Sequence, residues 1–146
     1  MNKEDLKWYR EHGYPETVVN TAEEIANKVE KFYNLVFDFM FISNTQNEGH
    51  EEYPSLWLIG QYDVVECKNF LSPRLDIDIA RYKGCVRYIN IITNNKNVLE
   101  VSSTESTMKL IVSLSDEVRC TLDAIGANCD KLNEIAKLYL NEYKSR

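Results

Sequence analysis

In this 146-residue sequence, side-chain types and spacing come closest to a chemical signature in YDVVECKNF, residues 62–70. Glu66 and Lys68 stand two positions apart, and residues two apart on a β-strand project from the same face. A carboxylate there could hold a divalent metal ion, while the ammonium positions a water molecule or steadies developing phosphate charge. The spacing therefore indicates a candidate site for metal-assisted phosphoryl chemistry.

The triplet Glu66-Cys67-Lys68 resembles the E-x-K half of the PD-(D/E)XK nucleases. This resemblance, which is confined to residues 62–70, implies an Mg²⁺-dependent nuclease whose metal is also held by an acidic residue on a neighbouring strand. The catalytic residues of this alternative are Asp38, Glu66 and Lys68. In the interpretation that we favour, Glu66 and Lys68 are a solvent-facing strand pair, and no residue is assigned a catalytic role.

The hairpin before the triplet decides whether an acid faces Glu66. The runs SLWLI and YDVVECK flank Gly60-Gln61, and a Gly-X pair between two apolar runs predicts a two-residue type II′ turn. Such a turn places Ser55 opposite Glu66, so the facing strand offers no acid. A metal site would have to be completed by Asp38, or by Glu51 and Glu52 of the segment 44–54, which has no apolar period and is predicted to be an exposed loop.

The charge of the chain disfavours some classes of partner. The net charge is −6; residues 1–60 hold 11 acids against 5 Lys and Arg, whereas residues 61–146 hold 12 of each. Such a surface repels phosphate backbones and anionic lipid, which disfavours nucleic acid and membrane partners, and it attracts a basic protein. Basic residues are concentrated in one place, between residues 74 and 88, where Tyr82 and Tyr88 alternate with them and Asp76 and Asp78 interrupt them. These basic residues are Arg74, Arg81, Lys83 and Arg87.

The sequence predicts a cytoplasmic protein without a metal or other cofactor. The first residues lack the apolar stretch of a signal peptide, and no run of 18 apolar residues occurs. Cys67, Cys85, Cys120 and Cys129 are far apart and form no C-x-x-C pair, so the usual ligand spacing of structural zinc is missing. We expect free thiols that are mostly buried.

Helical signals stand at both ends of the chain. Thr21 to Glu24 reads as a capping box, after a short helical opening, and begins a helix whose apolar face holds Ile25, Val29, Phe32 and Val36. Near the C-terminus, a helix is predicted from Ser115 until Gly126, with Val118, Leu122 and Ile125 on one face. A last helix follows, with its apolar stripe at Leu132, Ile135, Tyr139 and Tyr143.

Strand signals lie between these helices. Phe37, Phe39 and Phe41 alternate in strand fashion, and we prefer a strand at 36–43 over a continued helix. Further β-branched and aromatic runs continue to residue 113. The expected fold is α+β in one domain, residues 1–146, with N-terminal helices, an antiparallel meander of five or six strands and two C-terminal helices.

These patterns favour a binding protein over an enzyme. A small acidic domain suits a bacterial immunity protein, which is an inhibitor that neutralises a basic toxin or nuclease by binding to it. Acids give such a protein its rate of approach, and Tyr or Trp anchors its affinity. The predicted protein-binding residues lie in the loop at 44–54 and are Glu48, Glu51, Glu52 and Tyr53.

Overall fold

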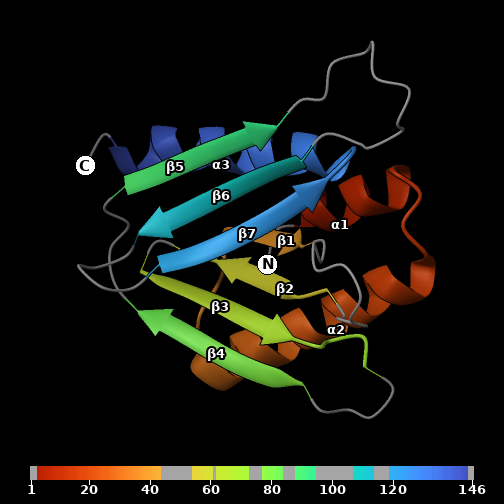
Figure 1. Ribbon diagram of the computed structural model, residues 1–146. Helices are drawn as coiled ribbons and strands as arrows, with labels where there is room; N and C mark the ends of the chain where they lie inside the picture. The colour runs from red at the N-terminus through yellow and green to blue at the C-terminus, as the bar shows by residue number, and fades with distance from the viewer. Residues whose placement is uncertain are drawn as a thin grey trace. The chain divides into compact units, whose positions relative to one another are not determined.

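A computed structural model describes residues 3–43, 54–60, 62–72, 77–83, 88–94, 107–113 and 119–144. The chain forms two compact units, unit 1 (Met1–Cys85) and unit 2 (Val86–Arg146) (Figure 1). Each unit combines an antiparallel sheet with helix, which confirms the α+β class. The expectation that residues 1–146 behave as one domain stays a prediction.

Unit 1 contains two helices followed by a four-stranded sheet whose strands lie in chain order, each antiparallel to the next. The predicted helical opening is confirmed, and a strand is present within 36–43. The elements are α1 (Lys3–Glu11), α2 (Glu16–Tyr33), β1 (Phe39–Ile42), β2 (Leu56–Ile59), β3 (Asp63–Lys68) and β4 (Asp78–Lys83).

Helix α2 begins at Glu16, five residues before the predicted capping box, so the predicted start at Thr21 was wrong. Pro15 occupies the N-cap with φ −55°, a fixed value that suits the entry into a helix, and Glu16 lies near the positive end of the helix dipole. Thr21 is in the helix interior, where its hydroxyl donates to the Thr17 carbonyl at 2.7 Å. Ser and Thr often bond back to position i−4 in this way.

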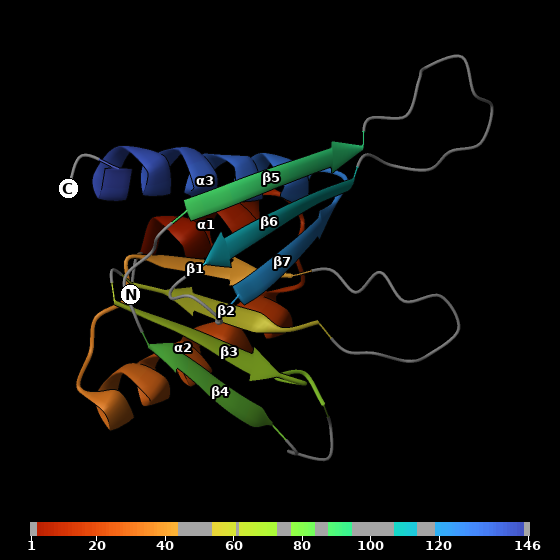
Figure 2. The ribbon, with the colours of Figure 1, turned by 60° about the vertical axis from the view of Figure 1, so that its left-hand side comes forward.

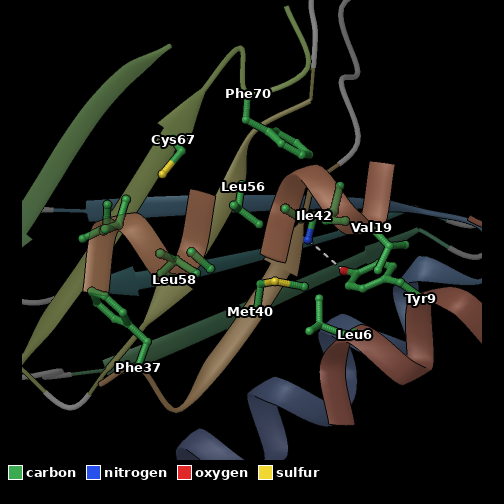
Figure 3. Packing of buried hydrophobic residues seen from close by; sticks show 14 residues of the cluster. Leu6, Tyr9, Val19, Phe37, Met40, Ile42, Leu56, Leu58, Cys67 and Phe70 are labelled. Carbon is green, nitrogen blue, oxygen red and sulfur yellow. Dashed lines mark hydrogen bonds between the residues drawn. The ribbon is translucent and has the colours of Figure 1, made fainter. Parts of the chain in front are cut away.

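The core of unit 1 lies between the two helices and one face of the sheet (Figure 3). The opposite face of the sheet also carries buried side chains, including Phe41 and Trp57. All four residues of β1 and of β2 are buried, as in strands buried on both faces. The helices and strands contribute to the core Leu6, Tyr9, Val19, Ala22, Ala26, Val29, Met40, Ile42, Leu56, Leu58, Val65 and Cys67.

Helix α1 satisfies the free edge of β1 with two side chains one turn apart. The Met40 N–H donates to Asp5 Oδ2 at 2.8 Å. The Ile42 N–H donates to the Tyr9 hydroxyl, also at 2.8 Å (Figure 3). Unpaired N–H groups at a sheet edge otherwise attract other strands. Burial raises the pKa of Tyr9 well above its usual 10.0, so the hydroxyl that accepts this bond stays neutral.

Unit 2 is a three-stranded antiparallel sheet with one helix across a face (Figure 2). Its strands again lie in chain order. Leu132 and Ile135 of the helix are buried with alternate residues of the sheet, such as Leu110 and Leu122. The elements are β5 (Tyr88–Asn94), β6 (Thr107–Ser113), β7 (Arg119–Ile125) and α3 (Asn128–Lys144).

The predicted helix from Ser115 to Gly126 was wrong, because Arg119–Ile125 is the strand β7, paired with β6. The segment RCTLDAI supports two periods. Leu122 and Ile125 fit a helical face, but Cys120, Leu122 and Ala124 alternate and are the residues that are buried. Pairing with β6 selects the period of two, since it places all three on one face. The described residues therefore contain one C-terminal helix instead of two, and seven strands.

Candidate functional site

The Glu66-Cys67-Lys68 triplet lies on β3, a central strand of the unit 1 sheet. Glu66 pairs with Trp57 on one side and with Ala80 on the other, while Lys68 pairs with Asp78. Glu66 and Lys68 share a face, as their spacing predicts. Lys68 is exposed, whereas Glu66 is half-buried.

The hairpin turn lies one residue later than predicted. The Gly60 N–H donates to the Asp63 carbonyl at 2.8 Å, and Ile59 pairs with Val64. The pairing is therefore shifted by two residues, and Trp57, not Ser55, lies opposite Glu66. Gly60 is therefore bonded across the hairpin before the turn, whereas the prediction placed it in the turn.

Ser55 nevertheless reaches Glu66 diagonally. The Ser55 hydroxyl donates to Glu66 Oε2 at 2.8 Å, within the range of a good O–H···O bond. The Ser43 hydroxyl in turn accepts from the Ser55 N–H at 3.0 Å. The Glu66 carboxylate is thus an acceptor that helps to hold the start of β2, a structural role that the sequence interpretation did not contain.

Asp38 does not join Glu66 and Lys68. Its N–H donates to the Ile59 carbonyl at 2.9 Å, which places it at the end of the sheet where the β2–β3 turn lies. Glu66 pairs with Trp57, and Trp57 pairs with Phe41 of β1. Phe41 is three residues after Asp38 in the chain. At about 3.3 Å per residue and 4.8 Å per strand, the two carboxylates are on the order of 10 Å apart along the strands and two strands apart across them. They cannot share a metal ion in this arrangement.

The Cys67 thiol, between Glu66 and Lys68 in the sequence, is expected to be unreactive at neutral pH. Cys67 is fully buried on the helix-covered face, and burial, aided by the Glu66 charge, raises its pKa to about 12. Since the thiolate is the nucleophile and the metal ligand, Cys67 suits neither role at neutral pH. Cys120 is also buried and, like Cys129, is a free thiol.

Other candidate ligands are dispersed in the part of the chain that the structure describes. Among those residues, no group of three or more His, Cys, Asp or Glu is placed to hold a metal ion. Nor does any described helix have the length and apolarity to cross a membrane. Neither finding concerns Glu48, Glu51, Glu52 and Tyr53, the predicted protein-binding residues, which lie outside the described ranges.

The basic concentration is partly tied into the fold. Arg81 Nε donates to Asp63 Oδ1 at 2.8 Å, with both side chains largely buried. The Arg81 guanidinium also lies 4.5 Å from the centre of the Tyr33 ring, a cation–π contact. Arg81 therefore links β3, β4 and α2. Lys83 is exposed, and Arg74 and Arg87 lie outside the described residues.

The structure exposes two side chains that the helical pattern assigned to the core. Phe32 is 81% exposed and Val36 is 80% exposed. Phe32 is within α2 but outside its buried stripe, which consists of Val19, Ala22, Ala26 and Val29. Val36 lies beyond the helix, which ends at Tyr33 and is followed by Asn34 in the left-handed conformation. Asn immediately after a helix is a recognised stop signal, and weighing it more heavily would have placed the helix end here.

The negative charge of the chain belongs to one unit. Residues 1–85, unit 1, hold 15 acids against 9 Lys and Arg, whereas residues 86–146, unit 2, hold 8 of each. The whole net charge of −6 is therefore carried by unit 1. At physiological salt such a field acts over about 8 Å, so its effect is confined to charged groups that come close to this unit.

Comparison with models of protein families, with curated proteins and with solved structures found no match for this chain. A functional proposal must therefore rest on the residues themselves.

Proposed function

We propose that this protein binds a basic protein and neutralises it without turnover, as an inhibitor of immunity type does for a basic toxin or nuclease. The observation that carries the proposal is the charge distribution, since unit 1 holds the entire net charge of −6 and unit 2 is balanced. A one-sided acidic field steers a basic partner and raises the association rate. The same field opposes the approach of nucleic acid.

The proposed contact surface is the acidic segment that joins β1 to β2. It carries Glu48, Glu51 and Glu52 together with Tyr53. Charged groups at the rim of an interface mainly set the association rate, whereas an aromatic anchor supplies affinity. In this proposal the three glutamates attract Lys and Arg of the partner, and Tyr53 is the anchor. The protein would act in the bacterial cytoplasm, before its partner reaches nucleic acid.

Capture of the partner from the native host is the first test. The tagged chain should retain a basic protein in a one-to-one ratio, and the purified complex should lose the partner's own activity. The loss of the partner's activity is the essential observation, because an acidic bait also retains basic proteins non-specifically. A partner that stays fully active when saturated with this protein would contradict the proposal.

The alternative, an Mg²⁺-dependent nuclease, has its own test. The distance between Asp38 and Glu66 speaks against it among the described residues, but Glu51 and Glu52 could still supply a carboxylate. Mg²⁺-dependent cleavage of DNA or RNA by the purified chain, lost in Glu66→Ala, would favour the nuclease over the inhibitor. We expect no such cleavage.

A further inference from the structure

The acidic segment between β1 and β2 leaves and rejoins the sheet at two serines that are bonded to each other. The Ser43 N–H donates to the Ser55 carbonyl at 3.0 Å. The Ser43 hydroxyl donates to the same carbonyl at 3.2 Å and accepts the Ser55 N–H at 3.0 Å. A hydroxyl can donate one hydrogen bond and accept two, so it can fill both roles at once. Three hydrogen bonds therefore join the two residues that flank the segment 44–54.

One of these bonds replaces a bond of the regular ladder. At every second pair of an antiparallel sheet, the two opposed residues exchange both of their backbone N–H···O=C bonds. Ser43 and Ser55 come directly after the pair Ile42–Leu56. The Ser55 N–H bonds to the Ser43 side chain, where a regular ladder would offer the Ser43 carbonyl. The hydroxyl of Ser43 thus continues the pairing of β1 with β2 by one residue, which alanine could not do.

A third side chain ties these serines to the neighbouring strand. The Ser55 hydroxyl donates to Glu66 Oε2 at 2.8 Å, and Glu66 lies on β3, on the other side of β2 from β1 (Figure 2). A hydrogen bond to a carboxylate is stronger than one between neutral groups. Ser43 is only 7% exposed, and Ser55 and Glu66 are half-buried, so solvent has limited access to these bonds. We call Ser43, Ser55 and Glu66 the serine clamp.

The turn at the other end of β2 is closed more simply. There the Gly60 N–H donates to the Asp63 carbonyl, which is one backbone bond across a connection of two residues. The connection between Ser43 and Ser55 has 11 residues, and the conformational entropy lost on closing a connection grows with its length. The additional side-chain bonds of the serine clamp offset this larger loss. The clamp therefore fixes the two points at which the acidic segment leaves and rejoins the sheet.

Fixed ends reduce the freedom that a binding segment has to give up. A contact surface that is ordered before the encounter loses less conformational entropy and so binds more tightly. Tyr53, the proposed anchor, is two residues from Ser55 in the sequence. We propose that the serine clamp positions the acidic segment for the basic partner, with Ser43, Ser55 and Glu66 as positioning residues. This inference rests on the function proposed above, and it gives Glu66 a role in binding instead of catalysis.

The serine clamp should act on the dissociation of the complex more than on its formation. Attraction between the glutamates and a basic partner depends on charge within about 8 Å at physiological salt, and it does not require that the ends of the segment are fixed. Loss of a bond that orders the contact surface shortens the lifetime of the complex instead, as most changes at an interface do. The two rate constants therefore separate the role of the clamp from the role of the glutamates.

Stopped flow with the basic protein captured from the native host is the test. Ser43→Ala, Ser55→Ala and Glu66→Ala should each raise the dissociation rate about three- to tenfold, which corresponds to one net hydrogen bond. Their association rates should stay within about twofold of the wild type. Glu66→Gln has the same charge as Glu66→Ala but keeps an oxygen acceptor, so its dissociation rate should return to within about twofold of the wild type. A clamp that served only the fold would lower stability and leave dissociation unchanged.

Ser113→Ala in unit 2 is the matched control. Ser113 is 3% exposed and, among the described residues, its hydroxyl has no hydrogen-bond partner, so both rate constants should stay at the wild-type values. Hydrogen exchange tests the clamp without the partner. In Ser43→Ala the Ser55 N–H loses its acceptor and should exchange about tenfold faster. The Asp38 N–H, bonded to the Ile59 carbonyl at the other end of β1, should exchange at the wild-type rate.

Two outcomes would overturn this inference while the partner still binds. One is a complex that dissociates at the wild-type rate in both Ser55→Ala and Glu66→Ala. The other is an unchanged exchange rate of the Ser55 N–H in Ser43→Ala, which would show that the clamp does not hold the ends of the segment. If the host supplies no partner at all, the proposed function fails, and the role of the clamp in binding fails with it.

Discussion

At the scale of single residues, side chains of unit 1 accept hydrogen bonds from backbone or side-chain groups that are distant in the sequence. Asp5 and Tyr9 of α1 accept hydrogen bonds from two backbone N–H groups of β1 that are more than 30 residues away in the sequence. Their spacing of one helical turn is visible in the sequence, but their partners depend on a tertiary arrangement that periodicity does not encode. The same holds for the bond from Ser55 to Glu66.

Removal of the Tyr9 hydroxyl should destabilise the protein. Tyr9→Phe keeps the ring but leaves the buried Ile42 N–H without its acceptor, which should lower the free energy of unfolding by about 1–3 kcal/mol. Urea denaturation measures the change. Tyr62→Phe, at a 55% exposed side chain, is the control and should stay within about 0.5 kcal/mol of the wild type. Equal effects would refute the edge-capping role of Tyr9.

Cys67 should make stability depend on pH above the neutral range. Its folded pKa is about 12, against the usual 9.0, so the unfolded chain releases the thiol proton first as pH rises. The stability that the neutral thiol supports is complete below pH 9 and is lost between about pH 9 and pH 12. Relative to Cys67→Ala, wild-type stability should fall by about 1 kcal/mol per pH unit above pH 9. Parallel pH profiles in the two proteins would contradict this assignment.

At the scale of elements, the sequence predicted the kinds of structure better than their limits. The helical opening is present as predicted, and the β2–β3 hairpin and the strand β6 follow from a Gly-X turn signal and from a β-branched run. The capping box at Thr21 did not mark a helix start. The register of the hairpin differed because Gly60 lies before the turn and not in it. The strand β7 was mistaken for a helix because RCTLDAI fits both periods, and only its pairing with β6 decides between them.

The charged pair on β3 should matter little to folding. Lys68→Ala should change the free energy of unfolding by less than about 0.5 kcal/mol, as for an exposed strand residue. Glu66→Ala should cost somewhat more, about 1 kcal/mol, since it removes the acceptor of the Ser55 hydroxyl. Glu66→Gln keeps an oxygen acceptor and serves as the matched control. A cost of several kcal/mol for Lys68→Ala would show that the lysine has a buried partner.

At the scale of the whole molecule, two compact units differ in charge but share one short chain. The prediction of a single domain implies that both units unfold together. Calorimetry should then show one transition whose calorimetric and van't Hoff enthalpies agree. Two separate transitions would establish two domains and would require the proposed function to be tested on each unit.

The acidic field of unit 1 is central to the account, and association kinetics test it most directly. The measurement compares two triple variants of equal net charge, one with Glu48, Glu51 and Glu52 changed to Lys, the other with Glu100, Glu105 and Glu142 of unit 2 changed to Lys. Binding to the captured basic partner is followed by stopped flow at rising salt.

We predict that the unit 1 variant associates about tenfold or more slowly than the wild type at low salt, and that this difference shrinks as salt rises. The association rate of the unit 2 variant should fall much less. Equal loss in the two variants would show that only net charge matters, and an unchanged rate in the unit 1 variant would contradict the proposal that its acidic segment receives the partner.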